Sequence, residues 1–159
     1  MKISLVAGAG QACSACSVRQ FNVCAALDNS EQHELEQLGH HARFTPGQTV
    51  FAQEELMTSV YNVLDGVMRL YKLLPDGRRQ IVGFALPGDF LGMAPARHGF
   101  SADAIGPVDV CKFARTSFVR FAENRPHLLR RVNELAAREL SEAREHLVLS
   151  LALVILSVG

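Results

Sequence analysis

Several residue patterns that mark other protein classes are missing from this chain of 159 residues. Lysine and arginine equal aspartate and glutamate, 16 against 16, so the net charge gives no reason to expect nucleic-acid binding. No stretch reaches the roughly 20 apolar residues of a transmembrane helix, so no membrane association is expected. The six histidines form neither a nucleophile–base pair nor the histidine-rich strand motif of a cupin-like metal enzyme, so the chain is predicted not to be an enzyme. His40 and His41 are expected on a solvated loop.

The N-terminal stretch "MKISLVAGAGQAC" lacks the features of two familiar motifs. Glycines interrupt its apolar run and no A-x-A cleavage site follows, so a secretory signal is not favoured. It also fails as a dinucleotide-binding loop, because Cys13 occupies the third glycine position of G-x-G-x-x-G and no βαβ alternation follows. With 48% hydrophobic and 20% charged residues, the chain is predicted to be a globular cytoplasmic protein.

Three of the four cysteines lie close together near the N-terminus. Cys13, Cys16 and Cys24 have the spacing C-x2-C-x7-C, and Cys111 lies far downstream in "VDVCKFA". Structural disulfides are rare in the cytoplasm, so clustered thiols there favour metal or redox chemistry. A zinc site usually has two C-x2-C pairs, and a thioredoxin-like pair needs a βαβ setting. Four unliganded thiols are a further alternative.

The middle of the chain has the pattern of a β-rich domain. Ser30 to Gly39 reads as a short helix with Ser30 as its N-cap and Gly39 at its C-terminus. Short apolar runs then follow, separated by the turn pairs Pro46-Gly47, Asp65-Gly66, Asp76-Gly77 and Pro87-Gly88. Regular turns of this kind indicate a sandwich or barrel of short strands. We therefore predict an α+β fold in which residues 40–113 form an eight-stranded jelly roll.

A long helix is predicted after Pro126. Its apolar residues recur at intervals of three or four and form one narrow seam on the helix surface. Small residues in such a seam suit close helix–helix approach, so a parallel homodimer is expected. The alternative is that the helix packs back on its own barrel. The residues assigned to dimerisation are Val132, Ala136, Leu140, Ala143 and Leu147.

Together these features resemble the CRP/FNR family of bacterial regulators. The stretches "FTPGQTVF", "VYNVLDGVMRLYKLLPDGRRQIVGFALPGDFLG" and the helix after "RPHLLRRVNE" carry the resemblance, which covers about residues 13–149. The family implies a cyclic-nucleotide-binding-like barrel followed by a dimerisation helix. The cysteine pattern looks like the oxygen-sensing FNR branch, particularly its FnrN/FixK-like members. By that resemblance, Cys13, Cys16, Cys24 and Cys111 are the four thiolates that hold a [4Fe-4S] cluster, whose conversion by oxygen favours the monomer.

The resemblance also raises cyclic-nucleotide binding as an alternative. Nucleotide-binding members carry a Glu for the ribose and an Arg-Ser pair for the cyclic phosphate after "GDFLG". Here Met93 stands in the Glu position and Phe100 precedes Ser101 in the Arg position. A small-molecule binding module without a metal cluster is therefore the alternative function, supported less well by these residues.

The resemblance ends near Leu149. Full-length relatives continue into a helix-turn-helix module that reads DNA, whereas this chain continues as "LALVILSVG". DNA and RNA polymerase are therefore expected as partners of the full-length family and not of this chain. A shifted or interrupted reading frame is the explanation that we favour for the changed tail. The predicted organisation is a cysteine-rich cluster-binding segment (1–28), a barrel (29–125), a dimerisation helix (126–150) and an apolar tail (151–159).

Overall fold

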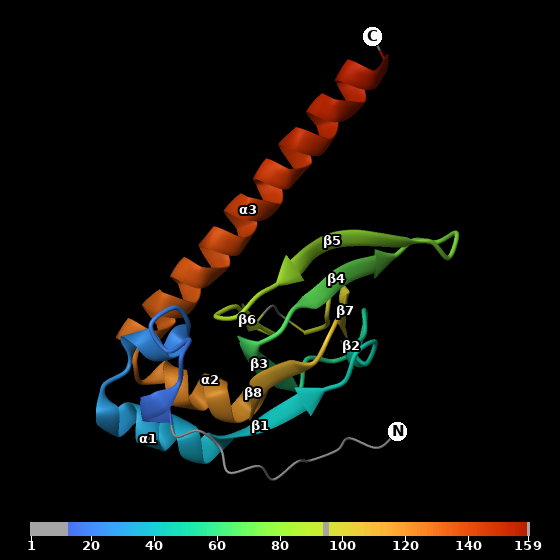
Figure 1. Cartoon of the computed structure of the whole chain (residues 1–159). Helices are drawn as coiled ribbons and strands as arrows, with labels where there is room; N and C mark the ends of the chain where they lie inside the picture. Colours follow the sequence, from blue (N-terminus) through green and yellow to red (C-terminus); the bar gives the residue numbers. More distant parts are fainter. Residues whose placement is uncertain (1–12, 94–95, 159) are drawn as a thin grey trace.

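The computed structural model describes residues 13–93 and 96–158 and has the predicted jelly-roll architecture (Figure 1). Two four-stranded antiparallel sheets have the strand orders β1-β8-β3-β6 and β2-β7-β4-β5. The stretch 1–12, which includes most of the glycine-rich motif considered above, lies outside the described residues. The strands are β1 (Gly39–Phe44), β2 (Thr49–Phe51), β3 (Ser59–Asp65), β4 (Met68–Leu73), β5 (Arg79–Ala85), β6 (Phe90–Leu91), β7 (Ser101–Ala104) and β8 (Val108–Ala114).

The four predicted turns form where glycine supplies a left-handed backbone. Gly47, Gly66, Gly77 and Gly88 all have φ between +80° and +99°. Gly66 shows why no other residue suits its position: a Cβ there would lie 2.2 Å from the carbonyl oxygen of Pro107. The turn thus combines a positive φ with a close backbone approach, and both require glycine.

Two apolar clusters form on opposite faces of the sheet that contains β8. Val63 and Val110 are cross-strand partners that point into the barrel, where they pack with Phe44, Met68 and other residues of both sheets. Val60 and Phe113 are a cross-strand pair of the same two strands that points the opposite way, to the outer face. The outer face is covered by the helices, so the region between the helices and β8 is a second core. The candidate site lies there.

The helix α1 (Asn29–Leu38) begins one residue earlier than predicted. Its N-cap is Asp28 and not Ser30, because the Asp28 carboxylate accepts the Glu31 N–H while the Glu31 carboxylate accepts the Asp28 N–H. This reciprocal capping box satisfies two backbone donors at once. Gly39 has φ −112° and starts β1, so it is not a left-handed helix cap.

Two short 3₁₀ helices carry Cys13 and Cys24, and one further helix was not predicted. They are η1 (Cys13–Ala15) and η2 (Val23–Ala26). The additional helix, α2 (Arg115–Glu123), follows β8 directly and buries Phe118, Phe121 and Ala122 at i, i+3 and i+4 spacing. It lies beside α1 at the end of β8, and its buried residues belong to the second core (Figure 1).

The last helix, α3, runs without interruption from Pro126 to Val158. The tail from 151 onward is therefore an extended helix end, and α3 projects far beyond the barrel (Figure 1).

The residues of α3 that were assigned to dimerisation differ in their burial. Val132 is 8% exposed and packs in the chain's own second core, as the alternative reading required, whereas Ala136 and Leu140 are exposed. The side chains of Ala143 and Leu147 lie outside the described part. In the described residues no helix is apolar over a stretch long enough to span a membrane.

Candidate thiol site

The N-terminal cysteines are held by polar contacts to their backbone. Cys13 donates its N–H to the Glu36 carboxylate of α1 at 3.2 Å, which fixes the start of the segment against that helix. Cys16 follows in a turn in which its N–H donates to the Cys13 carbonyl at 3.3 Å. Cys24 lies in η2, and its N–H donates to Asn22 Oδ1 at 2.8 Å. The Asn22 side chain thus caps η2 and fixes the backbone of Cys24.

Cys111 lies in the middle of β8, which is flanked by β1 and β3. Its cross-strand partners are His41 on β1 and Asn62 on β3, so these three side chains share the outer face of the sheet. Cys111 Sγ is 3.6 Å from His41 Nε2. His41 is therefore part of β1 and touches a site residue, which corrects its expected place on a solvated loop. His40 also belongs to β1, although its side chain is exposed.

The structure brings the distant Cys111 to the N-terminal cysteines. Cys24 is 7% exposed and belongs to the second core, and Cys111 packs against the same apolar cluster. Burial, followed by the effects of Cys13 and Cys16, raises the pKa of Cys24 to about 12. Burial is also the main reason that the pKa of Cys111 is raised, followed by the effects of Cys13, Cys24 and Cys16. Each of the three N-terminal thiols therefore acts electrostatically on the thiol of Cys111 in β8.

The charged residues around the thiols shift the thiol pKa values in opposite directions. Glu36 raises the pKa of Cys13 and of Cys111, after the larger effect of burial in both. Arg19 lowers the pKa of Cys13 and of Cys24, but less than burial raises them. The net result is that the pKa values of Cys13, Cys24 and Cys111 are raised, so their thiolates are disfavoured in the chain alone. A bound cation or metal cluster would reverse this balance, because metal binding replaces the proton on a thiol.

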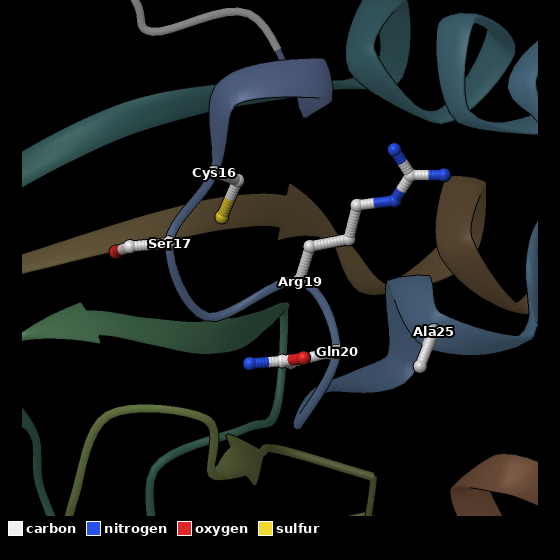
Figure 2. Close-up of a pocket in the computed structure, with 5 residues that line it drawn as sticks. All are labelled: Cys16, Ser17, Arg19, Gln20 and Ala25. Atoms are coloured by element: carbon white, nitrogen blue, oxygen red, sulfur yellow. The ribbon is translucent and has the colours of Figure 1, made fainter.

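An open cavity gives solvent access to one side of the site (Figure 2). Its volume is about 440 Å³, and Figure 2 shows Cys16 and Arg19 projecting from the same loop that forms its wall. Cys16 is half-buried, in contrast to the buried Cys24. A small molecule such as dioxygen can therefore approach Cys16 without any movement of the barrel. The lining residues are Cys16, Ser17, Arg19, Gln20 and Ala25.

The four thiols are the donor type that iron–sulfur clusters use. Among the described residues, no three histidine, cysteine or acidic side chains converge as ligands of one metal ion. A cubane is larger than an ion, so its four thiolate ligands stand farther apart. Asn22 adds a suitable neighbour: its Nδ2 is buried and has no hydrogen-bond partner within the described part of the chain. A donor of this kind can bond to the sulfur of a bound cluster. Four thiols and a buried amide donor are thus residue types that a [4Fe-4S] group would use.

The barrel segment considered above for cyclic-nucleotide binding makes contacts within the chain. Ser101 Oγ accepts the Gln53 N–H at 2.9 Å, so this hydroxyl is already engaged. Arg97 donates to the Glu54 carbonyl. The ring of His98 stacks on Phe51 with centroids 3.9 Å apart.

Three residues of the thiol site were not found from the sequence: Asn22, Glu36 and His41. Asn22 could have been found from the sequence, because an Asn side chain commonly accepts the backbone N–H of the residue two positions later. Glu36 and His41 carried none, since their contacts depend on how α1 and β1 pack against the cysteines.

Comparison with known proteins supports this architecture. Residues 41–125 match the protein family described as "Cyclic nucleotide-binding domain". The chain is 64% identical over 141 residues to the nitrogen fixation regulation protein FixK of Bradyrhizobium diazoefficiens, and the match covers 88% of this chain and 60% of that protein. It is 54% identical over 135 residues to the transcriptional activatory protein AadR of Rhodopseudomonas palustris, covering 84% and 56% respectively.

A solved structure agrees with these sequence matches. The structure of FixK2 from Bradyrhizobium japonicum is similar with a TM-score of 0.65 and 32% identity, covering 69% of this chain and 56% of that chain. The matches to the two curated relatives span 56–60% of their length. Their names are those of transcription regulators and not of enzymes, which agrees with the predicted lack of enzyme activity.

Proposed function

The chain belongs to the CRP/FNR family of transcription regulators, and we propose that it is the sensory and dimerisation region of an oxygen- or redox-responsive member. In this proposal Cys13, Cys16, Cys24 and Cys111 hold a [4Fe-4S] cluster. The observation that carries it is that Cys111 packs against the same apolar core as Cys24 and is near enough to Cys13, Cys16 and Cys24 for them to raise its pKa. We place the protein in the cytoplasm, where such thiols remain reduced.

A bound cluster would supply oxygen-sensitive redox chemistry, and the chain's own residues would set its surroundings. Cys24 and Cys111 would hold one side of the cluster against the apolar second core. Cys16 lies on the open side, beside the cavity that Arg19 and Gln20 line. Glu36 fixes the backbone of Cys13. This asymmetry supports a sensor: access is limited to one side while the other side is packed against β8 and the helices.

The test of the cluster is iron and sulfide content per chain after strictly anaerobic reconstitution. We expect about four of each in the wild type. Cys16→Ser and Cys111→Ser should each lose the cluster, whereas Ser17→Ala, which changes the same cavity wall without removing a thiol, should keep it. Stoichiometric zinc in place of iron, or a full cluster in both cysteine variants, contradicts the proposal. Tight binding of a cyclic nucleotide by the iron-free chain would favour the alternative function.

The proposed dimer uses the exposed part of α3. Leu140 is 55% exposed and Ala136 is exposed beside it, one turn earlier, so a second copy of the helix could cover both. DNA and RNA polymerase are proposed as partners of full-length relatives only. Leu140→Glu should convert an anaerobic dimer to a monomer in sedimentation experiments. Ser141→Glu adds the same charge about 100° round the helix and serves as the control. A dimer that survives Leu140→Glu would place the interface elsewhere.

A further inference from the structure

The cysteine segment is joined to α3 by both apolar and polar contacts. Leu128 and Val132 of α3 belong to the same core cluster as Val23 and Cys24 of η2. Figure 1 shows η2 and the preceding loop lying against the first turns of α3, in agreement with their contacts. Between Leu128 and Val132, Arg131 turns its side chain toward the cysteine segment and is 25% exposed.

The guanidinium of Arg131 binds two consecutive carbonyl groups. Its Nη2 donates to the Phe21 carbonyl at 3.0 Å and its Nε donates to the Asn22 carbonyl at 3.2 Å. Its Nη1 lies 3.4 Å from the Glu134 carboxylate, which holds the side chain from the other end. The planar fork suits this arrangement, since a lysine ammonium on a flexible chain does not span two fixed acceptors in the same way.

Asn22 continues this connection to Cys24. Asn22 is fully buried, its carbonyl is held by Arg131, and its side-chain oxygen holds the Cys24 N–H. The Asn22 N–H is also bonded, to the Val18 carbonyl at 3.2 Å. The peptide that leads into Cys24 therefore has little freedom to move unless its bonds to Arg131 break or α3 moves with it.

We infer that Arg131 is a positioning residue that couples the thiol site to the long helix through the backbone of Phe21 and Asn22. The inference rests on the proposed function for its regulatory meaning, but its structural part needs no bound cluster. A change at Cys24 displaces the carbonyls that Arg131 holds, and a change in α3 displaces Cys24 in return. Such coupling is reciprocal, because each end responds to the same difference in free energy.

The first experiment measures alkylation of each cysteine in the reduced, iron-free chain by mass spectrometry. Arg131→Gln should label Cys24 about tenfold faster than the wild type, because opening of the segment then breaks fewer hydrogen bonds. Arg131→Lys should fall between them. Arg130→Gln is the matched control, since it removes the same charge from an exposed neighbour, and it should leave Cys24 unchanged. Adding Arg131→Gln to Asn22→Ala should bring little further increase, since both act on one connection.

Two outcomes overturn this structural part. One is equal labelling of Cys24 in the Arg131→Gln and Arg130→Gln variants. The other is a parallel rise at all four cysteines in Arg131→Gln, which indicates general loosening of the fold. Cys16 is the internal reference, because it lies beside the open cavity in every variant.

The second experiment measures the dimer dissociation constant of the anaerobic iron-loaded chain before and after exposure to air. We expect exposure to air to raise the dimer dissociation constant about tenfold or more in the wild type and in Arg130→Gln. This change is within the usual range of coupling between sites. Arg131→Gln should reduce the shift to about threefold or less at equal iron content. An unchanged shift refutes the coupling. A wild type that takes up no iron refutes the proposed function instead, and the alkylation result still decides the role of Arg131.

Discussion

Gly39 and Phe113 are cross-strand partners in β1 and β8, and the Phe113 ring fills the space that a side chain on residue 39 would need. A Cβ on residue 39 would lie 2.3 Å from Phe113 Cε1. The ring itself is 4% exposed and has a tilted contact with Phe118 of α2, with centroids 5.9 Å apart. Because residue 39 has no side chain, the Phe113 ring can pack over the end of β1 in the core beside the thiols.

The first prediction follows from this contact. Gly39→Ala should lower the free energy of unfolding by about 1–3 kcal/mol, because the buried ring must shift to make room. Gly83→Ala is the control, since a Cβ there meets nothing within 4 Å, and it should change stability by less than about 0.5 kcal/mol. Urea unfolding of the two variants measures the difference. Equal effects would mean that the ring relaxes freely.

The second prediction concerns the start of α1. Asp28→Ala should cost about 1 kcal/mol of unfolding free energy, because it removes the acceptor of the Glu31 N–H. Ser30→Ala should stay within about 0.5 kcal/mol, since Ser30 is an exposed residue inside the helix. The same unfolding assay applies to both. A larger loss from Ser30→Ala than from Asp28→Ala would restore Ser30 as the cap.

The third prediction is a loss of stability at alkaline pH that depends on Cys24. Its pKa is about 12 in the folded chain, against an ordinary value of 9.0, so between these values the unfolded chain releases a proton that the folded chain keeps. Unfolding therefore becomes easier as pH rises from 9 toward 12. Cys24→Ala should make this dependence less steep by up to about 1.4 kcal/mol per pH unit. An identical slope in variant and wild type would show that Cys24 ionises freely.

The fourth prediction is a loss of stability at acid pH that depends on His98. Burial lowers the pKa of this ring below 6.5, so on acidification the unfolded chain takes up a proton before the folded chain does. The stabilisation is complete above pH 6.5 and declines as pH falls below it. His98→Phe keeps an aromatic ring against Phe51 but cannot titrate, so its unfolding free energy should depend less on pH in this range. Parallel curves for the two proteins would contradict this assignment.

The parts of the fold that could be predicted from sequence are those that depend on local chemistry. The glycines after Pro46, Asp65, Asp76 and Pro87 mark turns because few other residues adopt a positive φ, and this was enough to place the barrel. The short helix α2 was missed although Phe118, Phe121 and Ala122 have helical spacing, because a helix of only nine residues gives a weak periodic signal.

The contacts of the thiol site depend on tertiary packing and could not be predicted in this way. The four cysteines stood out by spacing and by resemblance, but their neighbours did not. Arg131 and Asn22 are 109 residues apart, and no local pattern relates them. His41 was misplaced because a polar residue after a helix suggests a loop, whereas β1 is held by its pairing with β8. Ladder pairing outweighed local composition there.

The packing of Leu128 and Val132 around Cys24 has a consequence for how the protein is made. The ribosome releases the cysteine segment first, yet the core that covers it is incomplete until α3 begins to emerge. At 5–20 residues per second, the roughly 100 intervening residues take about 5–20 seconds to synthesise. During that interval the thiols of Cys13, Cys16 and Cys24 belong to a nascent chain that cannot yet bury them. Oxidants and metal donors in the cell therefore reach them most easily before the chain is complete.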